Sequence, residues 1–160
     1  MKSKPMDAPR SENVSPFRQG DGTASYVVIY DGRCNLCSTL VQALAQLERG
    51  SLFRYAPMQD TETLAHWQIT PEACEMGMIL LKLDNPQQRW QGSDAAEEIA
   101  RLLPAGAAII QAYRAIPGLK ALGDRTYVQV RDHRYAWFGR RSQTYRSEYP
   151  YSACDACDAR

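Results

Sequence analysis

The chain lacks several features that would assign it at once to a class of protein. Its 160 residues carry a formal net charge of +1 and only two histidines. No apolar run approaches the roughly 18 residues that a membrane-spanning helix requires. A charge so close to zero argues against a protein that binds nucleic acid or an anionic membrane through its overall field. We therefore expect no nucleic-acid partner and no membrane span.

The N-terminal region also lacks the apolar core of a secretory signal. Residues 1–24 are polar and rich in Pro, Ser and Asp, which predicts a disordered leader. The five cysteines are an odd number. In a chain without a secretory signal, cysteines in a Cys-x-x-Cys are more often catalytic or metal-binding than structural. These features predict a cytoplasmic protein.

The most informative segment joins a strand pattern to two cysteines. Apolar and β-branched residues at 26–30 are followed, after a short turn, by the Cys-x-x-Cys of Cys34 and Cys37. A helix is predicted over 34–49, because apolar residues recur there at three- and four-residue spacing: Leu40, Val41, Leu44 and Leu47. The thiols thus lie where a strand passes into a helix, and free backbone N–H groups with the helix dipole lower a thiol pKa there.

The rest of the chain alternates between strand and helix patterns. Strands are predicted over 52–56, 78–83 and 87–91, and helices over 60–69, 94–103 and 107–116. Asp94 and Glu97 have capping-box spacing at the start of one helix. The stretch 125–138 fits both an alternating strand and a helical stripe. The element order is that of a thioredoxin fold, an α/β class with a mixed sheet of about four strands and extra C-terminal helices.

Residues 31–37, Asp-Gly-Arg-Cys-Asn-Leu-Cys, resemble the Asp-x-x-Cys-x-x-Cys signature of the DCC family of thiol–disulfide oxidoreductases. Residues 91–95 and 124–139 are similar to later parts of that family. The resemblance extends over 25–142 and implies a thioredoxin-like domain there, redox activity, and a helix for 125–138. Residues 143–160 are then expected to be a flexible tail with a second Cys-x-x-Cys.

Cys34 is the expected nucleophile, because it lies nearer the free N–H groups and follows Arg33, whose charge favours a thiolate. Cys37 lies one helical turn further on and is expected to be the more buried thiol, which resolves the mixed disulfide. Asp31 is expected to cap the helix by accepting from the N–H of Arg33 or Cys34. The alternative role for Asp31 is that of proton acceptor for a thiol.

These residues predict a dithiol–disulfide oxidoreductase that acts on a protein or small-molecule disulfide, with an unidentified reductant and without cofactor or metal. One alternative is a zinc-stabilised binding module with four cysteines: Cys34, Cys37, Cys154 and Cys157. Another is a non-catalytic thioredoxin-fold binding domain. Thioredoxins have a cis-proline just before the third core strand, where this chain has Glu75-Met76-Gly77.

Residues 125–146 hold six arginines against a single acid and include several aromatic side chains. Such a mixture can stack bases and pair with phosphates. No RNA-binding signature accompanies it, so we expect a solvated helix face with its aromatic side chains in the core. Cys74, a lone cysteine, is expected to be an incidental thiol.

Overall fold

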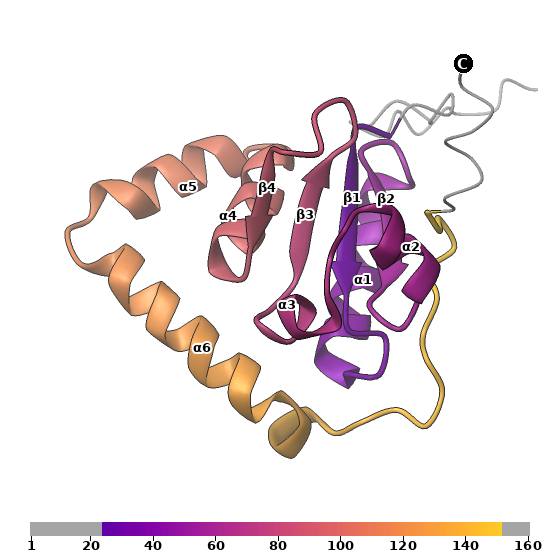
Figure 1. Ribbon diagram of the computed structural model, residues 1–160. Coiled ribbons are helices and arrows are strands. Elements are labelled where there is room, and N and C mark those ends of the chain that lie inside the picture. Colours follow the sequence, from indigo (N-terminus) through magenta and orange to yellow (C-terminus); the bar gives the residue numbers. More distant parts are fainter. Residues whose placement is uncertain (1–23, 152–160) are drawn as a thin grey trace, which may run out of the picture.

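The computed structural model describes residues 24–151 and shows one sheet with helices on both faces (Figure 1). The elements follow in chain order: β1 (Tyr26–Tyr30), α1 (Asn35–Glu48), β2 (Phe53–Pro57), α2 (Thr61–His66), α3 (Pro71–Glu75), β3 (Ile79–Lys82), β4 (Arg89–Gln91), α4 (Ser93–Leu102), α5 (Gly106–Ala115) and α6 (Leu119–Phe138). The sheet has the order β2-β1-β3-β4. Strand β2 pairs parallel to β1, whereas β3 pairs antiparallel to both β1 and β4.

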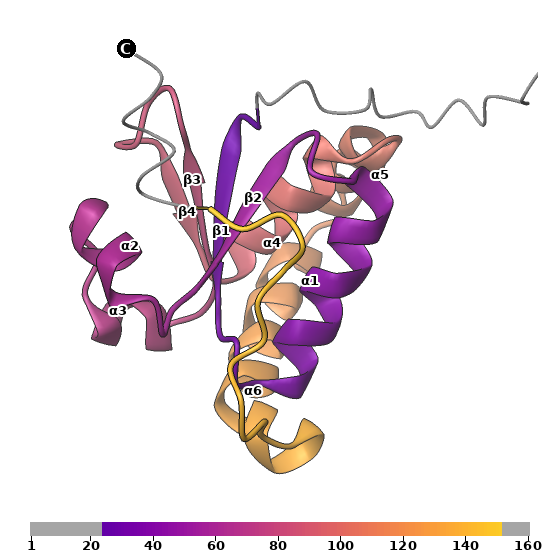
Figure 2. The same cartoon turned by 90° about the vertical axis from the view of Figure 1, so that its right-hand side faces the viewer.

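The central strand β1 is buried on both sides, because successive side chains point to opposite faces of the sheet. Val27 and Ile29 pack with residues of α2 and α3 on one face. Val28 and Tyr30 pack with residues of α1 and α4 on the other face. Figure 2 shows these layers on either side of the sheet. This arrangement confirms the predicted α/β class with a mixed sheet and a thioredoxin-like core.

Helix α1 turns a different stripe to the core from the one that its leucines indicate. Its buried residues are Ser38, Val41, Ala45 and Glu48. Leu40 and Leu47 are 50% and 51% exposed. The predicted stripe is therefore correct for Val41 and wrong for these two leucines, because the helix faces the sheet through a row that contains small and polar residues.

Helix α6 settles the ambiguous stretch 125–138 as helix, as the family resemblance implies. It contacts α1, α4 and α5 and runs along the edge of the molecule (Figure 1), and none of its residues is fully buried. Trp137 and Phe138 are 57% and 43% exposed, so the expectation of core aromatics is wrong for both. Tyr127 and Tyr135 are half-buried. Within residues 24–151, every helix is too short or too polar to cross a bilayer.

After α6 the chain returns across the molecule as a segment that we call the strap, residues 139–151 (Figure 2). The N–H of Tyr55 donates to the carbonyl of Tyr149 at 3.0 Å, and the N–H of Tyr151 donates to the carbonyl of Tyr55 at 2.9 Å. Tyr151 is only 7% exposed. The predicted flexible tail is therefore wrong for 143–151, because β2 is an edge strand whose free backbone groups hold the strap.

Two predicted segments lie outside the described residues. They are the leader, apart from residue 24, and the second Cys-x-x-Cys, at Cys154 and Cys157. Among the described helices, α2 ends at His66 rather than at residue 69. Helix α3 was not predicted; it begins with Pro71 in its first turn after the cap Thr70.

Candidate dithiol active site

The Cys-x-x-Cys lies at the junction of β1 and α1, where the sequence pattern places it. Cys34 is the N-cap of α1 with an extended backbone of φ −84° and ψ 124°. Its Sγ accepts a hydrogen bond from the backbone N–H of Cys37 at 3.4 Å. The sulfur therefore takes the place of the oxygen in an ordinary N-cap and receives one of the free N–H groups of the first turn.

The two thiols have opposite acidities. The Cys37 thiol donates to Cys34, and this hydrogen bond, with the backbone N–H of Cys37, outweighs burial and lowers the pKa of Cys34 to about 6. The same contact, together with burial and the charge of the Cys34 thiolate, raises the pKa of Cys37. The two shifts favour a thiolate at Cys34 over a thiolate at Cys37. A nucleophile and its resolving thiol need this division of charge.

The burial of the two residues is the reverse of the sequence-based expectation. Cys34 is 0% exposed, whereas Cys37 is half-buried and lines a cavity. The strap causes this difference, because it crosses the turn on the side of Cys34. There the N–H of Arg141 donates to the carbonyl of Arg33 at 2.7 Å, and residue Arg140 forms an isolated bridge with Cys34.

Gly32 is a point of very close approach between the turn and the strap. The N–H of Tyr145 donates to the carbonyl of Gly32 at 2.8 Å, and the hydroxyl of Tyr30 donates to the carbonyl of Tyr145 at 2.8 Å. A Cβ at residue 32 would lie 2.6 Å from Cγ2 of Thr144 and 2.9 Å from the carbonyl oxygen of Tyr145. Any side chain here would push the strap away, so glycine is what lets the strap cover Cys34.

Asp31 is a buried carboxylate, 6% exposed, that is surrounded by donors. Its Oδ1 accepts from the N–H of Arg33 and from Nε2 of Gln59, each at 2.9 Å. Its Oδ2 accepts from the hydroxyl of Tyr135 and lies 3.4 Å from Nη2 of Arg134. Burial alone would raise the pKa of Asp31, but these donors, Tyr135 foremost, hold it below its ordinary value.

Sequence reasoning found Asp31 but missed its partners from elsewhere in the chain. The carboxylate accepts from the N–H of Arg33, as expected, although the N-cap of α1 is Cys34. Arg134 and Tyr135 are separated from Asp31 by 103 and 104 residues. The family resemblance of residues 124–139 was the available signal that this segment belongs near the dithiol.

A cavity of about 240 Å³ lies beside Cys37. Asp31, Cys37 and Cys74 are all on its wall, so a third thiol faces the same space. Burial raises the pKa of Cys74 to about 11, which keeps that thiol protonated at neutral pH. The cavity therefore brings a carboxylate and two thiols with raised pKa values to one place, and Cys34, whose pKa is lowered, accepts from the backbone N–H of Cys37.

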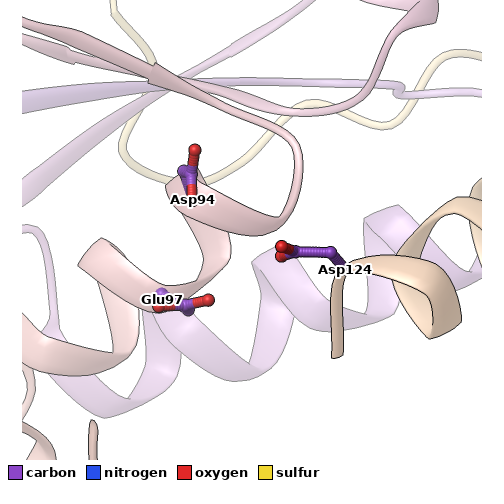
Figure 3. A group of neighbouring side chains, drawn as sticks. All are labelled: Asp94, Glu97 and Asp124. Atoms are coloured by element: carbon purple, nitrogen blue, oxygen red, sulfur yellow. The ribbon is translucent and has the colours of Figure 1, made fainter. Parts of the chain in front are cut away.

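The described residues also include an acidic group with spacing suited to a metal ion: Asp94, Glu97 and Asp124 (Figure 3). The ammonium of Lys120 lies 2.9 Å from Asp94 and 3.0 Å from Glu97, and it also pairs with Asp124. It occupies the position that a cation would take. The predicted capping box at Asp94 is wrong, since the N-cap of α4 is Gly92 and makes no side-chain cap bond.

A mixed α/β sheet with a Cys-x-x-Cys at the start of its first helix defines a thioredoxin-like protein with a dithiol site. The model of the DCC1-like thiol-disulfide oxidoreductase family matches residues 28–140. The chain belongs to this family, which confirms the resemblance seen in residues 31–37. No curated protein and no solved structure matches the chain.

Proposed function

We propose that the protein reduces a disulfide substrate through the nucleophile Cys34 and the resolving thiol Cys37. The Cys34 thiolate attacks one substrate sulfur, breaks the substrate disulfide, forms a mixed disulfide and releases one thiolate. Cys37 then attacks Sγ of Cys34, forms the Cys34–Cys37 disulfide and releases the second thiolate. The dithiol supplies two electrons, and Cys37 gives up one proton. A reducing compartment such as the cytoplasm, predicted from the sequence, would keep the resting pair reduced.

The observation that carries this proposal is the capped position of Cys34, whose Sγ accepts from the N–H of Cys37. Cys74 is an internal comparison, because it is buried in the same protein without that cap. Its pKa is raised to about 11, whereas the pKa of Cys34 is lowered to about 6. Burial alone therefore raises a thiol pKa in this protein and leaves a poor nucleophile. The hydrogen bonds at the start of α1 lower the pKa of Cys34 and favour the reactive thiolate.

Asp31 is the proton acceptor for Cys37 in the second step of this mechanism. Both residues line the cavity, and the charge of Asp31 contributes to the raised pKa of Cys37. Arg134 and Tyr135 lower the pKa of the carboxyl, which leaves it unprotonated before the step but also makes it a weaker base. The same two residues position it, because their hydrogen bonds fix Oδ2.

The test is trapping and titration of single-cysteine variants. Cys37→Ser should accumulate a mixed disulfide, because the first step remains and the second is blocked, whereas Cys34→Ser should trap none. The double variant Cys34→Ser/Cys37→Ser is the matched control and should trap none either. Equal adducts from both variants, or a Cys34 pKa of about 8.5 as in an unperturbed thiol, would contradict the proposal.

The same purified sample should be assayed for zinc. The proposal expects substoichiometric zinc and a melting temperature that a chelator does not change. Stoichiometric zinc with chelator-sensitive stability would instead support the four-cysteine binding module, because structural zinc is coupled to folding.

A further inference from the structure

We propose that the cavity beside Cys37 binds the organic part of the disulfide substrate, and that this part is a compact apolar group with an acidic substituent. The inference rests on the proposed function and narrows its substrate class to a small molecule. A volume of about 240 Å³ lies just below the roughly 300–1,000 Å³ of common ligand sites. A substituted aromatic ring fits that size.

The body of the cavity is apolar and is assembled from distant parts of the chain. Leu36 and Leu40 come from α1, Met58 follows β2, Met78 precedes β3, and Val130 comes from α6. Methionine side chains adapt their shape to a ligand at low cost. A wall of this kind favours a flat or branched hydrocarbon group over a polar peptide.

Two guanidinium groups lie on the cavity wall, those of Arg131 and Arg134. Arg131 pairs with Asp132 at 2.8 Å, and Arg134 lies 3.4 Å from Asp31. The Nε atom of Arg134 is buried and has no hydrogen-bond partner among residues 24–151. A buried donor without a partner is costly, and an acidic group that enters the cavity beside Arg134 would give this donor an acceptor.

The dithiol borders the cavity through Cys37. Cys34 is covered by the strap and is 0% exposed, whereas Cys37 forms part of the cavity wall. A disulfide presented by a folded protein needs an exposed nucleophile at the surface. A small disulfide can instead place its organic group in the cavity, with its sulfur next to Cys37. The Cys34 sulfur lies directly behind, 3.4 Å from the backbone N of Cys37, so its attack on the substrate needs a movement of the Cys37 side chain.

The test compares two tryptophan variants of α6 in the full chain. Val130→Trp fills the cavity, whereas Val128, 39% exposed and absent from the cavity wall, gives the matched control Val128→Trp. The probe is dithiobis-nitrobenzoate, an aromatic disulfide with a carboxylate on each ring, and each variant is first reduced with dithiothreitol that is then removed. We expect the second-order rate constant of this single turnover to fall about tenfold or more in Val130→Trp and to stay within about twofold in the control.

A second measurement uses the wild-type chain alone, in case Val130→Trp does not fold. The probe is 2-naphthoate, which is apolar, acidic and free of sulfur. It should compete with dithiobis-nitrobenzoate and shift the amide resonances of Met78 and Val130. The uncharged naphthalenemethanol should compete about tenfold more weakly, since it lacks the charge that an arginine recognises. Equal competition by the two compounds would overturn the acidic part of the proposal.

The outcomes separate this inference from the proposed function. If Cys34→Ser loses the reaction while both tryptophan variants keep it and 2-naphthoate fails to compete, the cavity proposal is overturned and the dithiol function stands. If Cys34→Ser reduces dithiobis-nitrobenzoate as fast as the wild type, the proposed function itself fails. Loss in Val130→Trp alone, with competition by 2-naphthoate, supports both.

Discussion

A cluster of charged and polar side chains lies near each end of α6, and the two clusters differ more in burial than in chemistry. The outer cluster lies at the start of the helix: Asp94, Glu97, Lys120 and Asp124. The inner cluster lies at its end: Asp31, Gln59, Arg134 and Tyr135. In the outer cluster the side chains of Asp94 and Asp124 are 58% and 42% exposed, although that of Glu97 is 10% exposed. The side chain of Asp31 is 5% exposed.

This difference decides what each cluster does. Ion pairs in contact with water are screened and contribute about 0–1 kcal/mol each to stability. A buried carboxylate must be fully hydrogen-bonded to be tolerated, and both oxygens of Asp31 are. The inner cluster borders the cavity that contains Cys37. The outer cluster joins α4 to α6, while the inner one brings a fixed charge to the dithiol.

The largest effect should come from Asp31→Asn. The variant leaves Arg134 buried without its counter-charge, and breaking one side of a buried pair costs about 3–5 kcal/mol of unfolding free energy. Asp94→Asn in the outer cluster is the matched change, with an expected cost of about 1 kcal/mol or less. Urea denaturation of both variants measures the difference. Equal losses would mean that burial does not distinguish the two clusters.

A smaller effect is expected from Tyr135→Phe. The hydroxyl of Tyr135 donates to a carboxylate, and a hydrogen bond to a charged group contributes about 1.5–3 kcal/mol. Its loss should also raise the pKa of Asp31, because Tyr135 is the foremost donor that lowers it.

The control is Tyr127→Phe, which removes a neutral hydrogen bond to the N–H of Met78 and should cost about 1 kcal/mol. Chemical denaturation and carboxyl resonances of Asp31 against pH test this. An unchanged Asp31 titration would remove Tyr135 from its positioning role.

The sequence was sufficient for the parts of the site that are local in the chain. The strand at 26–30, the turn and the helix that follows Cys34 all lie within one strand–helix unit, where hydrophobic periodicity and turn chemistry are informative. The family resemblance then placed helix at 125–138. The inner cluster was not predicted, because Asp31 and Tyr135 are 104 residues apart and no local pattern reports such a pairing.

The order of burial of the two cysteines also required the structure. Helical position alone puts Cys37 on the inner stripe and Cys34 at the open end of α1. The strap reverses that order, and it consists of polar and aromatic residues with no periodic pattern. Its attachment depends on the free edge of β2 and on the missing side chain of Gly32, two features that become visible only once the chain is folded.

Low pH and added salt should change the stability contributions of the two clusters to different extents. The pKa values of Asp31 and Asp124 both lie below the ordinary 3.8 in the folded protein. Each therefore contributes stability above that pH, and the contribution is lost as pH falls through the folded value. Adding salt should abolish the contribution of exposed Asp124 and largely preserve that of Asp31. Melting temperatures of Asp31→Asn and Asp124→Asn, below pH 4 and at neutral pH in low and high salt, measure this. Equal salt sensitivity would contradict the distinction.

The smallest effect is expected from Lys120→Met, which tests whether the ammonium occupies a cation position in the outer cluster. The side chain is 33% exposed, so its ion pairs are partly screened and the loss should be about 1 kcal/mol or less. Three carboxylates then face one another without a positive charge between them, and oxygen ligands of this kind suit Ca²⁺. Calcium should therefore raise the melting temperature of Lys120→Met, by binding the folded state alone, and leave that of the wild type unchanged. Arg101→Met, which removes an exposed pair with Glu98, is the control that should not respond to calcium. If calcium stabilises the wild type as much as the variant, Lys120 does not hold the position that a metal would need.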